Sequence, residues 1–111
     1  MSSSAIEIVV PTATGVAVNE DTLTVDLSDG RSISAPLAWF PRLVHASHEE
    51  RRTWSFIGRG EGIHWPKLDE DISVEGLIAG QPSGESQRSF AKWLESRARR
   101  SKRAAKRVKK R

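Results

Sequence analysis

Hydrophobic and polar residues alternate along three successive segments in the first third of the chain. The apolar positions are Val16 and Val18, then Leu23, Val25 and Leu27, then Ile33, Ala35 and Leu37. A period of two is typical of β-strands with one buried face. The pattern predicts a three-stranded antiparallel meander. Ile6, Ile8 and Val10 alternate in the same way and predict a short edge strand that ends at Pro11.

The turn between the second and third predicted strands decides which residues face each other. If Ser28-Asp29-Gly30 is a three-residue loop with Gly30 in the left-handed region, Val25 lies opposite Ile33. A two-residue Asp-Gly turn would place Asp26 opposite Ile33 and turn apolar side chains towards water. The hydrophobic pattern therefore predicts the longer loop.

Helical spacing replaces the alternation from residue 37 onwards. Leu37, Phe40, Leu43 and Val44 recur at three or four residues, which predicts a short helix over about residues 41–46. The segment Ser47-His48-Glu49-Glu50 has the spacing of a capping box, in which the serine and the second glutamate satisfy each other's backbone N–H groups. It predicts a second short helix to about residue 53.

Two tryptophan-containing strands, over residues 54–57 and 62–65, are predicted next. They form a hairpin through Gly58-Arg59-Gly60-Glu61 and are closed by Pro66. The glycine spacing resembles a phosphate-binding loop, but a helix must follow such a loop to supply its N-terminal dipole. No helical pattern follows, so the glycines are assigned to the turn.

The remaining third is predicted to be helical. Ser73 is a good N-cap for a helix over about residues 74–79, with Asp69, Glu70 and Asp71 at its start and Gly80 at its end. A single long helix follows from residue 84, with an apolar side only in its first three turns. The predicted division is a leader (1–12), an α+β domain (13–96) and a basic tail (97–111) that is disordered when free.

Charge is distributed unevenly along the 111 residues. Residues 88–111 contain twelve Lys/Arg and one acid, whereas residues 1–87 contain six Lys/Arg and thirteen acids. An acidic body therefore carries a basic tail, and the two parts suit different partners. The chain has no Cys, no apolar run long enough to cross a membrane and no signal-like N-terminus, which predicts a cytoplasmic protein.

Two groups of residues were considered as metal sites. His45 and His48 lie one helical turn apart, and His64 lies on a predicted strand, but no further acid or histidine has matching spacing. Asp69 and Asp71 could hold magnesium in a nuclease, although acids are also favoured at the start of any helix. We predict no catalytic residue, metal or cofactor, and the acids are instead interpreted as a docking face.

The chain resembles a known bacterial family in five segments that occur in order. They are L-A-W-F-P-R-L, S-H-E-E-R-R-x-W, I-G-R-G-E-G-I-H-W-P, L-D-E-D-I-S-V-E-G-L and P-S-G-E-S-Q. These segments, within about residues 16–94, are similar to one branch of domain of unknown function 2442. The resemblance implies a small α+β domain, followed in some members by a helix-turn-helix, that acts as antitoxin to small toxin-like proteins. Here a Lys/Arg run follows Arg97 instead.

Two functional hypotheses follow. The first is a non-catalytic, antitoxin-like regulatory module whose acidic body binds a small basic toxin-like protein and whose tail binds DNA or RNA. The second is a stand-alone, non-specific nucleic-acid-binding protein; a metal-dependent nuclease is a remote third. The predicted partner-binding residues are Glu49, Glu50, His64, Asp69, Glu70 and Asp71. The predicted nucleic-acid-binding residues are Arg97, Arg99, Arg100, Lys102, Arg103, Lys106, Arg107, Lys109, Lys110 and Arg111.

Overall fold

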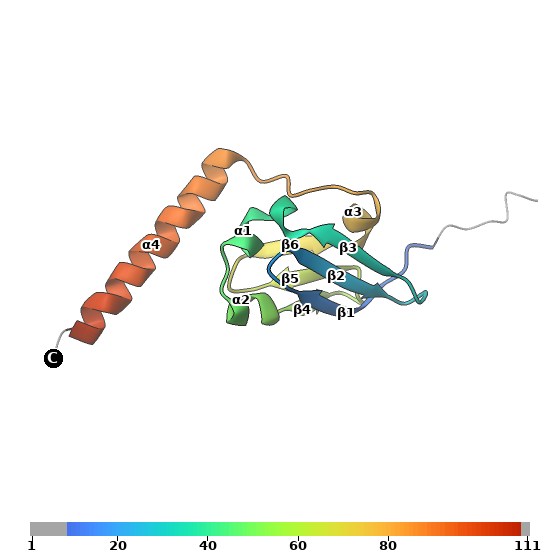
Figure 1. The fold of residues 1–111 in the computed structure, drawn as a ribbon, viewed down its shortest axis with the longest axis horizontal. Helices are drawn as coiled ribbons and strands as arrows, with labels where there is room; N and C mark the ends of the chain where they lie inside the picture. Colours follow the sequence, from blue (N-terminus) through green and yellow to red (C-terminus); the bar gives the residue numbers. More distant parts are fainter. Residues whose placement is uncertain (1–8, 110–111) are drawn as a thin grey trace, which may run out of the picture.

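Two small antiparallel sheets form the body of the protein (Figure 1). The computed structural model describes residues 9–109, with side chains to residue 104. The first sheet has the order β1-β2-β3, and the second has the order β4-β5-β6. The strands are β1 (Ala13–Val18), β2 (Thr22–Leu27), β3 (Ser32–Pro36), β4 (Ser55–Ile57), β5 (Gly62–Trp65) and β6 (Glu70–Ser73).

Short helices connect and flank the sheets, and one long helix extends away from them (Figure 1). The helices are the 3-10 helix η2 (Leu37–Trp39), α1 (Pro41–Val44), α2 (His48–Arg52), α3 (Val74–Ile78) and α4 (Gln87–Lys109). This arrangement confirms the predicted α+β class. Because α4 is continuous to Lys109, the predicted boundary at residue 97 does not coincide with the end of an element. Disorder of the free tail stays a prediction.

The register of the first sheet follows the hydrophobic pattern. Val25 pairs with Ile33, as the three-residue loop predicts. The N–H of Leu27 donates to the carbonyl of Arg31 at 2.8 Å, and Gly30 has φ of 93°. The loop therefore keeps the alternating apolar side chains on the buried face. The predicted edge strand is wrong at Val10, which is exposed and precedes β1, while Ile6 and Ile8 lie outside the described residues.

Side-chain caps start two of the short helices. The Ser47 hydroxyl accepts from the Glu50 N–H at 3.1 Å, and the Glu50 carboxylate accepts from the Ser47 N–H at 2.8 Å. This confirms the predicted capping box. The Ser73 hydroxyl likewise accepts from the Gly76 N–H at 2.9 Å. Both caps lie where the sequence predicts them, although α1 is two residues shorter than expected.

The segment containing the acidic cluster is a strand, which the sequence did not predict, although the helix after it begins at Val74 as predicted. Glu70–Ser73 forms β6, in which Ile72 pairs with Ile63 and Glu70 pairs with Trp65. Pairing with β5 satisfies the backbone and buries Ile72 against the core. Because β6 pairs with β5, the predicted hairpin is part of a three-stranded sheet, and helix α3 begins after this strand, at Val74.

The core lies between the sheets and the short helices. Trp65 is fully buried, and its indole Nε1 donates to the Arg51 carbonyl at 3.0 Å. Trp39 and Trp54 are only partly buried and pack against the core from its margin. Trp93 packs there too, from α4, as expected of a residue that docks the helix.

Replacing Trp65 with alanine is expected to lower the free energy of unfolding by about 3–5 kcal/mol, because it empties a large buried site. The loss also leaves the Arg51 carbonyl without its donor. Urea unfolding measures the effect, with Phe56→Ala as the control, because Phe56 is exposed on β4. Equal stability losses for both variants would contradict this description of the core.

Candidate functional site

Helix α4 is docked on the body through the aromatic side chains of its first half. The Arg97 guanidinium carbon lies 4.6 Å from the centre of the Trp93 ring, and that of Arg42, from α1, lies 5.2 Å away. Phe90 stacks on Trp93 with ring centres 5.7 Å apart. The Phe90 ring also contacts the His45 ring, and their centres are 5.3 Å apart. Cation–π and aromatic contacts therefore hold the helix against α1.

An ion pair between Arg97 and Glu50 fixes the end of the docked part. The Arg97 Nη2 lies 2.9 Å from Glu50 Oε1, and Nη1 lies 3.0 Å from Oε2. Hydrogen bonds from Arg97, with further ones from Ser47, lower the pKa of Glu50 to about 2 despite its partial burial. Arg97 was predicted to bind nucleic acid and Glu50 to bind a partner, but the structure pairs the two residues with each other.

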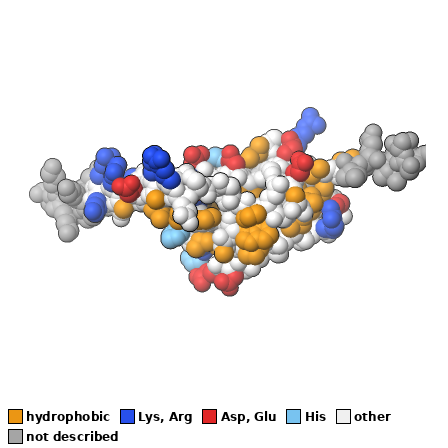
Figure 2. All heavy atoms as spheres, turned by 90° about the horizontal axis from the view of Figure 1, so that it is seen from above, with side chains coloured by type: hydrophobic (Ala, Val, Ile, Leu, Met, Phe, Trp, Pro, Cys, Tyr) orange, Lys and Arg blue, Asp and Glu red, His pale blue; other side chains and the backbone are white. Residues whose placement is uncertain are grey.

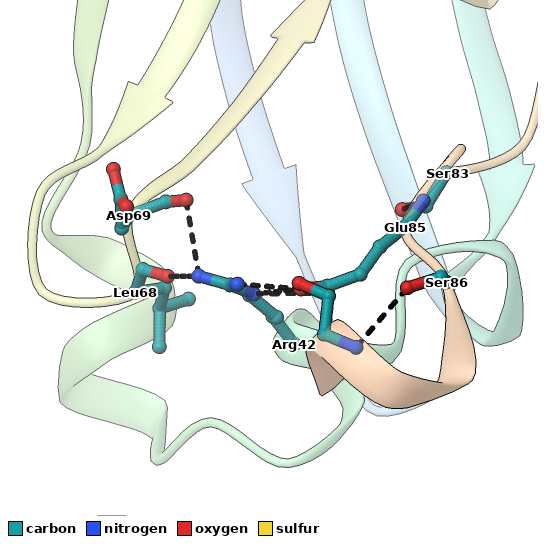
Figure 3. A network of polar contacts seen from close by, with 7 residues as sticks. Arg42, Leu68, Asp69, Ser83, Glu85 and Ser86 are labelled. Atoms are coloured by element: carbon teal, nitrogen blue, oxygen red, sulfur yellow. Dashed lines mark hydrogen bonds and ion pairs between the residues drawn. The ribbon is translucent and has the colours of Figure 1, made fainter. Parts of the chain in front are cut away.

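A second pair, between Arg42 and Glu85, ties the start of α4 to the body (Figure 3). The Arg42 Nε lies 2.9 Å and 3.0 Å from the two Glu85 oxygens. Its Nη1 donates to the carbonyls of Leu68 at 2.8 Å and Asp69 at 3.3 Å. Hydrogen bonds from Arg42 hold the pKa of Glu85 below its usual value. Arg42 thus joins α1, the turn before β6 and the segment leading into α4.

Three organising residues, Arg42, Glu85 and Arg51, were missed by sequence reasoning. Arg51 is buried, and its guanidinium donates to the carbonyls of Leu43 at 2.9 Å and Val44 at 3.0 Å. These bonds satisfy carbonyls at the C-terminal end of α1. One available signal was the position of Arg42 within the otherwise apolar α1.

Beyond Arg97, α4 presents cations to solvent. Arg99, Arg100, Lys102 and Arg103 are exposed, and Arg99 makes only a long contact of 3.6 Å with the exposed Glu95. Figure 2 shows Lys and Arg side chains gathered along the helix that extends from the body. Lys106, Arg107 and Lys109 belong to α4, but their side chains lie outside the described part, as do Lys110 and Arg111 entirely.

The predicted acidic face is only partly assembled. Lys67 Nζ lies 3.3 Å from Glu49 Oε1, so the start of α2 and the turn before β6 are neighbours. Asp69 is exposed with φ of 50°, a left-handed conformation that aspartate tolerates better than most residues. His64 and Asp71 contact each other across β5 and β6. Glu49, Asp69 and Asp71 remain accessible on this face.

Glu70 differs from the other acids because it is partly buried. It lines a cavity of about 470 Å³ together with Arg42, Asp69, Asp71 and Glu85. The pKa of Glu70 is raised to about 7. Burial is the largest cause, Arg42 opposes it, and the negative charges of Glu85, Asp71 and Asp69 act in the same direction as burial. Glu70 is therefore a titrating group near neutral pH rather than a simple surface charge.

The described residues contain no group of three His, Asp or Glu side chains placed to hold a metal ion. None of the described helices is both long and apolar enough to span a membrane. The three histidines lie on separate elements: His45 ends α1, His48 begins α2 and His64 is on β5. His48 lies 3.7 Å from Glu20, and both side chains are largely exposed.

Comparison with known proteins identifies a family and a fold. A family model described as "Protein of unknown function (DUF2442)" matches residues 13–83. A crystal structure of a protein of unknown function from Rhodospirillum rubrum is 29% identical, with a TM-score of 0.60 over 69% of this chain and 95% of that one. An uncharacterised protein from Chromobacterium violaceum, solved by NMR, is 23% identical, with a TM-score of 0.57 over 73% of this chain and 74% of that one. No curated protein is similar enough to match. These descriptions give no sign of catalysis.

Glu70→Gln is expected to stabilise the protein at neutral and alkaline pH. The raised pKa means that the folded state favours the protonated carboxyl, so its stabilising contribution is present below about pH 4.5 and is lost as the pH rises to about 7. The variant should therefore gain over the parent across this interval, with a constant advantage above it. Urea unfolding at several pH values measures this, with the exposed Glu75→Gln as control. A pH-independent difference would contradict the assignment.

Proposed function

The chain belongs to the DUF2442 family, and we propose that this member is a non-catalytic, antitoxin-like interaction module. Its helix α4 binds nucleic acid, and its acidic body binds a small basic protein. The observation that carries the proposal is the division of α4 into a docked half and an exposed, cationic half. Trp93 and Arg97 hold the first half, and of the cations that follow, Arg99, Lys102 and Arg103 are exposed and form no ion pair with the body.

Nucleic acid is the polyanion that suits this helix best. A phosphate backbone carries closely spaced negative charges, and each cation that neutralises a phosphate releases a condensed counterion. The sequence of α4 after Arg97 contains only cations and uncharged residues. Such an interface binds phosphates without reading bases, so the proposal is for binding of low sequence specificity.

The acidic body supports the second half of the proposal. Glu49 lies beside Lys67, which comes shortly before the Asp69–Asp71 segment, although Glu49 is distant from both in sequence. A basic partner would be steered to this face by its charge. Glu50 contributes less, because Arg97 already neutralises it.

A metal-dependent nuclease centred on Asp69 and Asp71 has less support. Asp71 contacts His64, and burial favours the protonated form of the intervening Glu70, which weakens it as a cation ligand.

Removal of residues 99–111 is expected to weaken nucleic-acid binding strongly while leaving the fold intact. The truncation removes nine Lys/Arg residues and no acid, but it keeps Trp93 and the pair between Arg97 and Glu50. Fluorescence anisotropy with labelled DNA and RNA at several salt concentrations measures the affinity, and thermal unfolding measures the fold. Binding by the parent should weaken steeply as salt increases.

A variant that loses positive charge from the body instead of from α4 provides a control for this truncation. Arg31 and Arg59 are exposed on turns of the body, so replacing both with glutamine lowers the charge without changing α4. This variant should bind nearly as tightly as the parent. If the truncated protein bound nucleic acid as tightly as the full chain, the proposal would be wrong.

Neutralising the acidic face tests the protein partner. Asp69→Asn with Asp71→Asn removes two charges, and asparagine tolerates the left-handed conformation at position 69. After nuclease treatment, the parent should retain a small basic protein from a lysate of its host, whereas the variant should release it at lower salt. Nucleic-acid binding should persist in the variant. If the parent retains no such protein, the stand-alone nucleic-acid-binding hypothesis becomes the better account.

A further inference from the structure

A groove of about 580 Å³ lies between the first half of α4 and the turn that precedes β6. Its walls come from two parts of the chain that are far apart in sequence. Residues 66–69 and Arg42 form the wall on the body, and Ser86, Arg88, Ser89, Lys92, Trp93 and Arg100 form the wall on α4. The groove is therefore a product of the docking described above and does not exist on an isolated helix.

The charge of this groove is strongly positive. Arg88 and Lys92 are four residues apart and share one face of α4, with Arg100 about two turns further along. Within the described residues, these three cations form no ion pair. Lys67 adds a cation from the opposite wall, and Asp69 is the one acid among the residues that line the groove. An anionic ligand would meet the unpaired cations of the α4 wall and, across from them, Lys67 in its solvent-exposed pair with Glu49.

The groove also contains an aromatic side chain. Trp93 is partly buried and lines the same space. Phe90, Arg42 and Arg97 already lie against its ring, so the part of Trp93 that borders the groove is the part left for a base to contact. A cationic channel with an aromatic side chain is the arrangement by which proteins hold single-stranded nucleic acid, because the backbone follows the charge and unstacked bases contact the ring. In a duplex the bases are already stacked, so its outer surface offers this groove only phosphates.

We infer that this groove binds single-stranded nucleic acid in preference to duplex. The inference rests on the proposed function and refines it by naming the form of the nucleic acid. The turn at residues 66–69 and Arg42 line the groove on the body side, so a strand that enters it meets both the body and α4. A single strand fits between the two walls and neutralises Lys67 together with Arg88 and Lys92.

Lys67 provides the decisive variant because it belongs to the body rather than to the basic helix. Anisotropy is measured with the full chain and a labelled single strand of about twelve nucleotides, within the usual site size. For Lys67→Gln, the slope of log affinity against log salt should decrease by about 0.7, and for Arg88→Gln with Lys92→Gln by about 1.4. A duplex of the same length should bind more weakly and be insensitive to Lys67→Gln.

Arg59→Gln is the matched control, since Arg59 is exposed in the turn between β4 and β5 and does not line the groove. It should leave the slope unchanged. If Lys67→Gln behaves like this control, or if duplex binds as tightly as single strand, the groove inference is overturned. If Lys67→Gln has no effect and the chain without residues 99–111 binds as tightly as the full chain, the proposed function is wrong as well. Loss of binding in that truncation with no effect at Lys67 overturns the groove alone.

Discussion

The pair between Arg42 and Glu85 is the interaction on which the placement of α4 depends. Taking both charges out of water is costly, and the cost is offset only when every donor and acceptor finds a partner. Here the guanidinium meets both carboxylate oxygens and two backbone carbonyls, and its face lies over Trp93. Loss of either member would leave a partly buried charge without compensation. Removing Arg42 would therefore free the turn before β6 and the segment leading into α4 together.

The separation of charge along the chain becomes a separation in space only because of this docking. Arg97 and Glu50 neutralise each other at the junction, and the exposed Arg99, Lys102 and Arg103 follow on the part of the helix that extends from the body. Glu70 adds a second consequence of the same packing. The loop that Arg42 holds carries this carboxyl into a partly buried position, where burial and neighbouring acids raise its pKa to about 7.

The sequence predicted those features that depend on local spacing. The register through Gly30 and the cap at Ser47 were predicted correctly, because alternation and hydrogen-bond reach act within a few residues. Strand β6 was missed because it contains one apolar residue, Ile72, and lies directly before a true helix cap. Its stability comes from pairing with β5, which local spacing does not encode. Arg42 and Glu85 were missed for a similar reason, since 43 residues separate them.

Helix α4 faces a conflict between packing and self-repulsion that bears on how it could act. Its docked half is stabilised by Trp93 and the two ion pairs, whereas the rest extends about 18 Å beyond Arg97 at 1.5 Å per residue. Repeated cations on that extension repel one another, and this repulsion is not offset by burial of apolar surface. A bound polyanion removes the repulsion, so binding and helix formation reinforce each other. Because the docked half fixes the helix axis, the extension that follows it is presented in one direction.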